Sequence, residues 1–132
     1  MFNDTISNIL TILRNGNAIK KKIVQMSANK ITAEILHLLV SEKYIDQYIS
    51  ITVNNKLYFL VFLKFSKKNK MTILNELKRI STPSLRLYTR SNNIPQVLNG
   101  LATVVISTSK GILTNHFASF YKIGGEMLFY IW

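Results

Sequence analysis

The segment STSKG, residues 107–111, holds the side chains of this sequence best suited to chemistry. Its lysine and glycine stand in the wrong order for a phosphate-binding loop, which needs GxxxxGK[ST] after a strand. Its three successive hydroxyls suit another task, because hydroxyls donate and accept hydrogen bonds and can contact base edges, ribose 2′-OH groups and phosphates of an irregular RNA. The alternative is an ordinary Ser/Thr turn that caps a helix. The segment alone excludes nucleotide hydrolysis by a P-loop and leaves these two interpretations open.

Residues for acid–base catalysis or metal binding are scattered along the chain. The histidines are His37, in an apolar helical pattern and expected to be partly buried, and His116, expected at the surface. The carboxylates occur singly, at Asp4, Glu34, Glu42, Asp46, Glu76 and Glu126. No paired acid and base, no serine held beside a base and no cage of hard-metal ligands is visible. The sequence therefore predicts a protein that is not an enzyme and that has no cofactor or metal.

The chain carries a large excess of positive charge. Its 17 Lys and Arg residues against 6 Asp and Glu residues give a formal net charge of +11 in 132 residues, of which 48% are hydrophobic. A basic surface kept for solubility is one explanation, but self-repulsion at this level destabilises a compact domain and usually matches a polyanionic partner. Nucleic acid is the partner that this charge favours, since its phosphates release counterions when Lys and Arg neutralise them.

Composition restricts the compartment. There is no cysteine, which rules out disulfides and thiolate metal sites and agrees with a reducing environment. The most apolar run, residues 57–63, is far shorter than the roughly 20 residues of a membrane span and indicates a buried strand. No Arg-rich, Ser-rich leader is recognisable, so we expect either synthesis where the protein works or a removed leader. Ile, Lys and Asn share AT-rich codons and make up a third of the chain, a bias typical of plastid genomes and of some bacteria.

Hydrophobic periodicity in the first half predicts the order α-β-α-β-β. The expected elements are a helix from a cap at Asp4 to Gly16, a strand at residues 22–26, a helix capped by Ser27 or Asn29 and ending near Glu42, and strands at residues 44–53 and 56–65. Asn54 and Asn55 tolerate positive φ and are expected to form the turn of a hairpin.

The second half predicts a mainly β arrangement with short helices, so the fold class is α+β with two small α/β subdomains. The expected elements are strands at residues 78–81, 86–88, 102–106 and 126–131, a turn at Thr82-Pro83-Ser84, a break at residues 107–111, and helices at residues 95–100 and 114–121. The basic stretch at residues 66–70 marks the expected boundary, giving subdomains 1–68 and 69–132, although helix could continue to Glu76.

The chain resembles a known family in both halves. In the second half the carrying segments are LKRISTPSLRLY, IPQVLNGLA, VVISTSKGILT and IGGEMLFYIW, and in the first they are DTISNILTILRNG and Asn29-Lys30. STSKG followed by GGE and a final aromatic strand is similar to the family of the eighth protein of the small ribosomal subunit, of bacterial and plastid type. The resemblance covers essentially all 132 residues, is weakest from about 44 to 76, and is closest to plastid members because of the YIW ending.

The resemblance implies a structural protein that binds an irregular helix in the central domain of small-subunit ribosomal RNA and supports subunit assembly, with neighbouring ribosomal proteins as further partners. The implied location is a plastid ribosome and an organelle gene, or otherwise a bacterial cytoplasm. The predicted RNA-binding residues are Ser107, Thr108, Ser109, Lys110, Tyr88, Arg86, Gly124, Glu126, Lys30 and Arg14.

Glu126 has a physical rationale within that set. A lone carboxylate at a basic RNA surface is unfavourable unless it accepts hydrogen bonds from base amino groups or orients the serine hydroxyls. The alternative is a surface glutamate paired with a nearby lysine.

Some positions depart from the family pattern. Thr82-Pro83-Ser84 replaces an Arg-Pro-Gly turn and loses a cation and a permissive glycine. Asn115-His116 replaces an acidic-Arg helix start, and Ser119 replaces an arginine, so phosphate contacts from the last helix are expected to be weaker. Thr5 and Leu13 stand in place of a proline and an arginine in the first helix. None of these changes touches STSKG or GGE.

Two alternative functions would also account for the basic charge of the chain. A small RNA-processing or RNA-modifying enzyme would need a convergent titratable pair, which the sequence lacks. A general single-strand binder would need exposed aromatics among cations. Most aromatics fall in apolar strand patterns, and only Tyr48, Tyr88 and Tyr121 are expected to be free.

Overall fold

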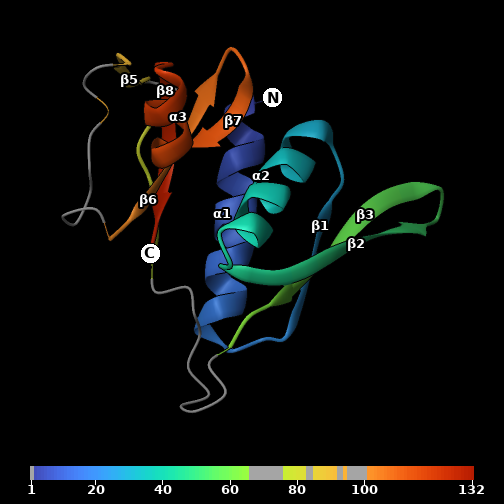
Figure 1. The fold of residues 1–132 in the computed structure, drawn as a ribbon. Coiled ribbons are helices and arrows are strands. Elements are labelled where there is room, and N and C mark those ends of the chain that lie inside the picture. Colours follow the sequence, from blue (N-terminus) through green and yellow to red (C-terminus); the bar gives the residue numbers. More distant parts are fainter. Residues whose placement is uncertain (1, 66–75, 83–84, 92–93, 95–100) are drawn as a thin grey trace. The chain divides into compact units, whose positions relative to one another are not determined.

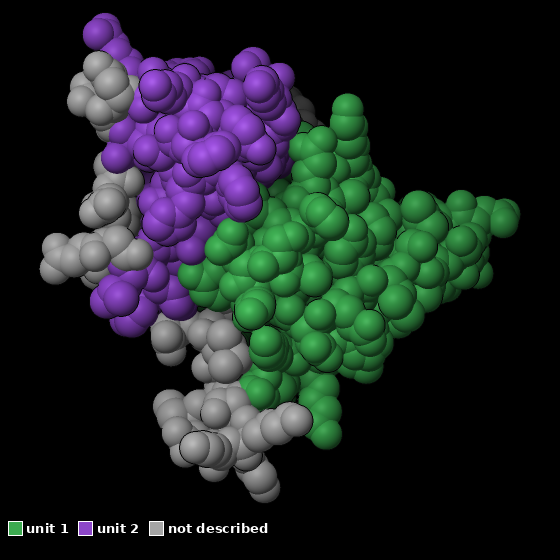
Figure 2. Space-filling model, viewed as in Figure 1, with its two compact units in different colours: residues 1–75 green, residues 76–132 purple. Residues whose placement is uncertain are grey.

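The computed structural model describes residues 2–65, 76–82, 85–91, 94 and 101–132, with side-chain burial described from residue 5. The chain divides into two compact units, unit 1 of residues 1–75 and unit 2 of residues 76–132, coloured separately in Figure 2. The boundary predicted near residue 68 falls outside the described residues and stays a prediction. Among the described helices, none has the length and apolar character needed to cross a membrane.

Unit 1 has the predicted order α-β-α-β-β (Figure 1). Its elements are α1 (Phe2–Ala18), β1 (Ile23–Ser27), α2 (Lys30–Ser41), β2 (Ile45–Val53) and β3 (Lys56–Leu63). The strands form an antiparallel sheet in the order β1-β3-β2. Its core consists of the apolar faces of the elements, among them Ile6, Leu10, Leu13, Val24, Ile35, Leu36, Leu39 and Val61.

The first helix is longer at both ends than predicted. It begins at Phe2, so Asp4 lies within the first turn and is not the cap, and it continues past Gly16 to Ala18. Gly16 is buried, and a Cβ there would lie 2.5 Å from Cγ1 of Val24 on β1. The glycine therefore allows β1 to lie close to α1. Its role is this close approach, and the helix does not end there.

Two local predictions in unit 1 are confirmed. Oδ1 of Asn29 accepts the backbone N–H of Thr32 at 2.9 Å, so Asn29 caps α2. Asn54 and Asn55 have φ of 52° and 63° and join β2 to β3. Two successive left-handed residues form the turn whose twist matches a hairpin, and asparagine tolerates this conformation better than most residues.

Unit 2 is mainly β with one described helix, which agrees with the predicted class (Figure 1). Its elements are β4 (Leu77–Arg79), β5 (Tyr88–Thr89), β6 (Thr103–Thr108), β7 (Gly111–Thr114), α3 (Asn115–Tyr121) and β8 (Gly125–Ile131). The sheet order is β4-β8-β6-β7, and β5 also pairs with β8. A small core forms where Val104, Ile106 and Ala118 pack with Met127 and Tyr130.

The break predicted at residues 107–111 is present but shorter than predicted, at residues 109–110. Strand β6 continues through Thr108, Ser109 and Lys110 form a turn, and Gly111, with φ of 106°, begins the unpredicted strand β7. The Ser/Thr run therefore lies mostly on the arm of a hairpin. Helix α3 agrees with its prediction, and Thr114 caps it by accepting the backbone N–H of Phe117 at 3.3 Å.

Other predictions differ by a few residues or lie outside the described part of the chain. The strands expected at 78–81 and 86–88 are β4 and β5, and β5 begins at Tyr88. The expected helix at residues 95–100, the basic stretch at residues 66–70, and Pro83 and Ser84 of the expected turn lie outside it.

Candidate nucleic-acid interface

A row of three side chains crosses the sheet of unit 2. Glu126 on β8 is opposite Tyr88 on β5 on one side and opposite Ser107 on β6 on the other. Directly opposite residues of antiparallel strands project from the same face of a sheet, with their Cβ atoms about 4.5–5.5 Å apart. The strand registers thus bring together three predicted site residues that are distant in sequence. We call Tyr88, Glu126 and Ser107 the β8 row.

Glu126 is the centre of the β8 row. Its side chain is only 9% exposed, and its Oε1 atom is buried without a hydrogen-bond partner. A buried acceptor left unpaired costs about 1–3 kcal/mol, and more when it is charged. The alternative for Glu126, a surface glutamate paired with a lysine, is therefore contradicted, since Glu126 is buried and forms no ion pair within the described residues. The described structure also gives it no hydrogen bond to a serine hydroxyl.

The three hydroxyls of STSKG differ in their contacts. Oγ1 of Thr108 donates to the backbone oxygen of Gly111 at 2.7 Å and accepts the backbone N–H of Lys110 at 3.2 Å, so it closes the hairpin turn. Ser107 is half-buried and Ser109 is exposed, and neither hydroxyl has a partner among the described residues. Thr108 therefore acts in the turn, and Ser107 and Ser109 have no such structural role among the described residues.

Two glycines set the spacing of the β8 row. A Cβ on Gly125 would overlap the backbone oxygen of Ser107, and a Cβ on Gly124 would overlap that of Thr89. A larger residue at either position would push β6 or β5 away from the start of β8, because backbone atoms cannot yield as a flexible side chain does. The structure thus gives Gly124 a packing role, and its predicted RNA contact stays a prediction.

Ser81 positions Tyr88 and was missed in the sequence. Its side chain is buried, and its hydroxyl donates to the backbone oxygen of Met127 on β8 and accepts the backbone N–H of Leu87 at 3.0 Å. The backbone N–H of Met127 also donates to the backbone oxygen of Leu87 at 2.9 Å. These bonds hold the residue before Tyr88 against β8. No local pattern reveals this role, because the partners lie 6 and 46 residues away.

The four remaining predicted RNA-binding residues are all exposed cations. Lys110 and Arg86 belong to unit 2, and Nζ of Lys110 lies 5.3 Å from the ring centroid of Tyr121. Arg14 on α1 and Lys30 at the start of α2 belong to unit 1. The β8 row therefore includes neither Arg14 nor Lys30, and their RNA contacts stay predictions.

Metal-binding groupings are absent from the described residues. No three His, Cys, Asp or Glu side chains among them lie close enough to hold a metal ion. His116 is exposed as expected, but His37, expected to be partly buried, is also exposed. On α2 the buried residues are Thr32, Ile35, Leu36, Leu38 and Leu39, so His37 falls on the opposite side of the helix.

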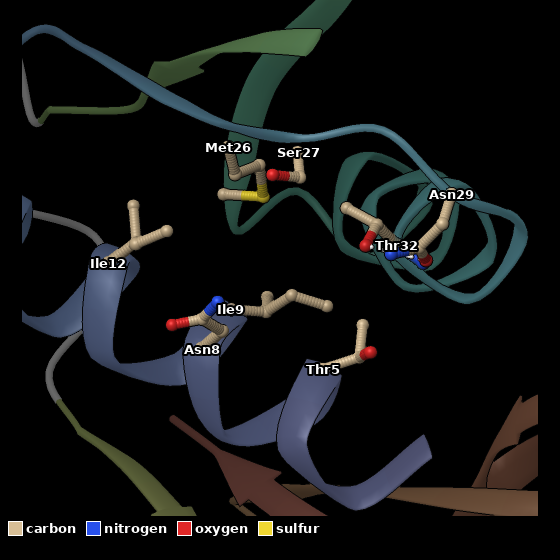
Figure 3. A pocket seen from close by; sticks show the side chains of 8 residues that line it. All are labelled: Thr5, Asn8, Ile9, Ile12, Met26, Ser27, Asn29 and Thr32. Atoms are coloured by element: carbon tan, nitrogen blue, oxygen red, sulfur yellow. Dashed lines mark hydrogen bonds between the residues drawn. The ribbon is translucent and has the colours of Figure 1, made fainter. Parts of the chain in front are cut away.

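Unit 1 contains a hollow of about 220 Å³ between α1, β1 and the start of α2 (Figure 3). Its lining residues are Thr5, Asn8, Ile9, Ile12, Met26, Ser27, Asn29 and Thr32. None of these side chains titrates in the ordinary pH range, and Oδ1 of Asn29 is already bonded to the backbone and hydroxyl of Thr32. This lining offers no acid, base or nucleophile pair for catalysis.

The exposure of the aromatic side chains differs from the prediction in both directions. Tyr88 and Tyr121 are 67% and 49% exposed, as expected, but Tyr48 is half-buried with its ring edge-on to Phe59 at 5.4 Å. Phe117 and Phe120 on α3 are also exposed, which the sequence patterns did not indicate. Their spacing on a short helix is the same as that of a buried apolar face. The sequence alone therefore cannot tell an exposed aromatic face from a buried one without knowing what packs on α3.

Comparison with known proteins matches this sequence over nearly all of its length. The family model described as ribosomal protein S8 matches residues 4–132. Three similar proteins bear the name small ribosomal subunit protein uS8c. They come from Marchantia polymorpha at 44% identity, Gracilaria tenuistipitata var. liui at 42% and Thalassiosira pseudonana at 41%, each aligned over 132 residues and all of both chains. The resemblance that the sequence motifs suggested is therefore confirmed, and the chain belongs to the ribosomal protein S8 family.

Proposed function

We propose that this protein binds an irregular helix in the central domain of small-subunit ribosomal RNA through the β8 row, and that it holds the helix in shape during subunit assembly. The coarser function follows from the family: the chain is a structural constituent of the small ribosomal subunit, of the plastid type, and not an enzyme. Ribosomal RNA and neighbouring ribosomal proteins are accordingly its partners.

The observation that carries the proposal is the unpaired Oε1 of Glu126. A carboxylate accepts hydrogen bonds and cannot donate them when ionised, so it is complementary to the amino groups of bases. A-form RNA presents base edges and 2′-OH groups in a wide, shallow minor groove. The free hydroxyl of Ser107 can bond to a 2′-OH group, because both groups donate and accept.

Tyr88 completes the proposed contact. Its side chain is 67% exposed beside Glu126, although tyrosine commonly buries most of its ring. An exposed ring can stack on an unpaired base, as irregular RNA helices offer and regular duplexes do not. The net charge of +11 supplies attraction to phosphates that is independent of sequence. The β8 row would then supply the discrimination between RNAs.

The test compares Glu126→Ala and Ser107→Ala with the unchanged protein on the central-domain helix and on a scrambled RNA of equal length. Each change should weaken cognate binding by about 1–3 kcal/mol, or roughly 5- to 150-fold, and scrambled binding much less. Affinities would be measured at several salt concentrations, so that the phosphate contribution is separated by its salt dependence.

The matched control is Glu34→Ala, which removes a carboxylate from α2 of unit 1. Both glutamate variants raise the net charge by one, and charge alone would tighten the binding of any RNA. Weaker cognate binding by Glu126→Ala together with unchanged or tighter binding by Glu34→Ala would support a direct contact. Equal losses on both RNAs, or no loss, would make the β8 row a structural feature only.

A further inference from the structure

Helix α3 presents a cluster of exposed aromatic side chains. Phe117, Phe120 and Tyr121 are 50%, 77% and 49% exposed, whereas the buried residues of the helix are Asn115 and Ala118. Aromatic residues stabilise a fold by burying 150–250 Å² each, so three exposed rings on seven helical residues contribute little to the core. We call these three residues the α3 aromatic cluster.

The rings of the cluster support one another. Phe117 and Tyr121 are one helical turn apart, with centroids 6.5 Å apart and planes inclined by 20°. Phe120 meets Tyr121 edge-on, with centroids 5.2 Å apart and planes at 85°. These contacts restrict the ring positions while the Phe120 ring stays mostly open to solvent. A surface that is already ordered loses less entropy when it binds a flat partner.

The surroundings of the cluster are cationic. Nζ of Lys110 lies 5.3 Å from the centroid of the Tyr121 ring, and the exposed Lys122 ends α3. Residues 109–123, which include the hairpin turn, β7 and α3, contain no Asp or Glu. An apolar surface among cations alone is complementary to a partner with flat apolar faces and negative charge.

We propose that the α3 aromatic cluster is a second RNA contact, on which an unpaired base stacks while Lys110 and Lys122 approach its phosphates. Aromatic rings interleaved with cations are the usual means of binding single-stranded nucleic acid, and stacking tolerates any base because every base has a π face. The cluster is separate from the β8 row: Ile106 packs with Ala118 of α3, and its strand neighbour Ser107 projects from the opposite face.

The experiment uses the full chain and a short single-stranded oligoadenylate that contains one 2-aminopurine, whose fluorescence falls when it stacks on a ring. The variant Phe120→Leu keeps an apolar side chain but removes the π face. Its affinity for the oligoadenylate should fall about tenfold, within the range measured for loss of one stacked base, and most of the quenching should disappear. Leu101→Ala is the matched control, because Leu101 is also 77% exposed in unit 2, and it should leave both values unchanged.

Two outcomes would overturn this proposal. Equal affinity and quenching for Phe120→Leu and the unchanged protein would exclude stacking on the cluster. Full oligoadenylate binding by Phe120→Ser, together with loss of its association with another ribosomal protein, would assign the cluster to a protein partner. Since the oligoadenylate has no base-paired helix, neither outcome bears on the proposed recognition of the central domain by the β8 row.

Discussion

Hydrogen bonding separates the polar side chains of unit 2 into two groups. The hydroxyls of Ser81 and Thr108 both donate and accept within the protein, and they hold β5 and the hairpin turn in place. Ser107 and Glu126 are at least half-buried, yet they have no side-chain hydrogen bond in the described structure. Because buried polar groups are normally paired, the unpaired group is the one that a ligand would complete. Residue type alone could not separate Ser81 from Ser107.

Ser81→Ala tests the structural group. The change removes a buried hydroxyl, so the backbone N–H of Leu87 and the backbone oxygen of Met127 each lose a hydrogen bond. The free energy of unfolding should therefore fall by about 1–3 kcal/mol. Urea unfolding followed by circular dichroism would measure the change. Ser119→Ala, at an exposed site on α3, should alter stability by less than about 0.5 kcal/mol. Similar values for the two variants would contradict the role assigned to Ser81.

The packing of α1 on β1 opposes helix propensity at Gly16. Alanine is favoured over glycine in a helix interior by about 1 kcal/mol, which alone predicts that Gly16→Ala stabilises the protein. A Cβ at this position, however, would lie 2.5 Å from Cγ1 of Val24, a buried and β-branched side chain that has little freedom to move. Overpacking of this kind typically costs about 1–3 kcal/mol, so we expect Gly16→Ala to be destabilising.

A double-mutant cycle separates the two effects. In a Val24→Ala background the obstructing methyl groups are gone, and Gly16→Ala should then be neutral or stabilising, as helix propensity predicts. Thermal and urea unfolding of the four proteins would give the coupling free energy. The same destabilisation in both backgrounds would mean that Gly16 is needed for a reason other than its contact with Val24.

The sequence predicted elements well where local physics decides them. The apolar stripes of α1 and α2, the cap at Asn29 and the turn at Asn54 and Asn55 depend on residues close in the chain, and all are present. The errors have two causes, a tertiary contact at Gly16 and the shortness of β7. Gly16 has the signature of a helix end but serves a close approach, and β7 has only four residues, too few for a periodic pattern.

The candidate site was predicted by family resemblance more than by pattern. Tyr88, Ser107 and Glu126 meet only because two strands pair with β8, and strand register across long separations is not visible in a local window. The burial of Glu126 could not be predicted from the sequence either, because a lone carboxylate is equally consistent with a surface residue. The resemblance selected these residues, and the registers explain why they lie side by side.

The division into two units leads to a prediction for the whole molecule. The β8 row and all of its partner strands lie in unit 2, so a fragment beginning near residue 70 should keep most of the specific affinity for the central-domain helix. The N-terminal half should bind weakly and without discrimination, through charge. Gel-shift titrations of both fragments against cognate and scrambled RNA would measure this. Circular dichroism must first show that each fragment is folded, and specific binding by the N-terminal half alone would contradict the assignment.

The central place of β8 also determines when the protein becomes competent. A nascent chain emerges from its N-terminus at about 5–20 residues per second, and β8 is made after β4, β5 and β6, the three strands that pair with it. All strands of unit 1 are synthesised before unit 2 begins. In unit 2, by contrast, Glu126 is synthesised 38 residues after its partner Tyr88, which takes roughly 2–8 seconds at that rate. Once β6 has been made, its edge on the β8 side stays unpaired until β8 follows, and the β8 row is incomplete until then. The order of synthesis thus withholds the proposed RNA contact from any chain that has not yet reached Glu126.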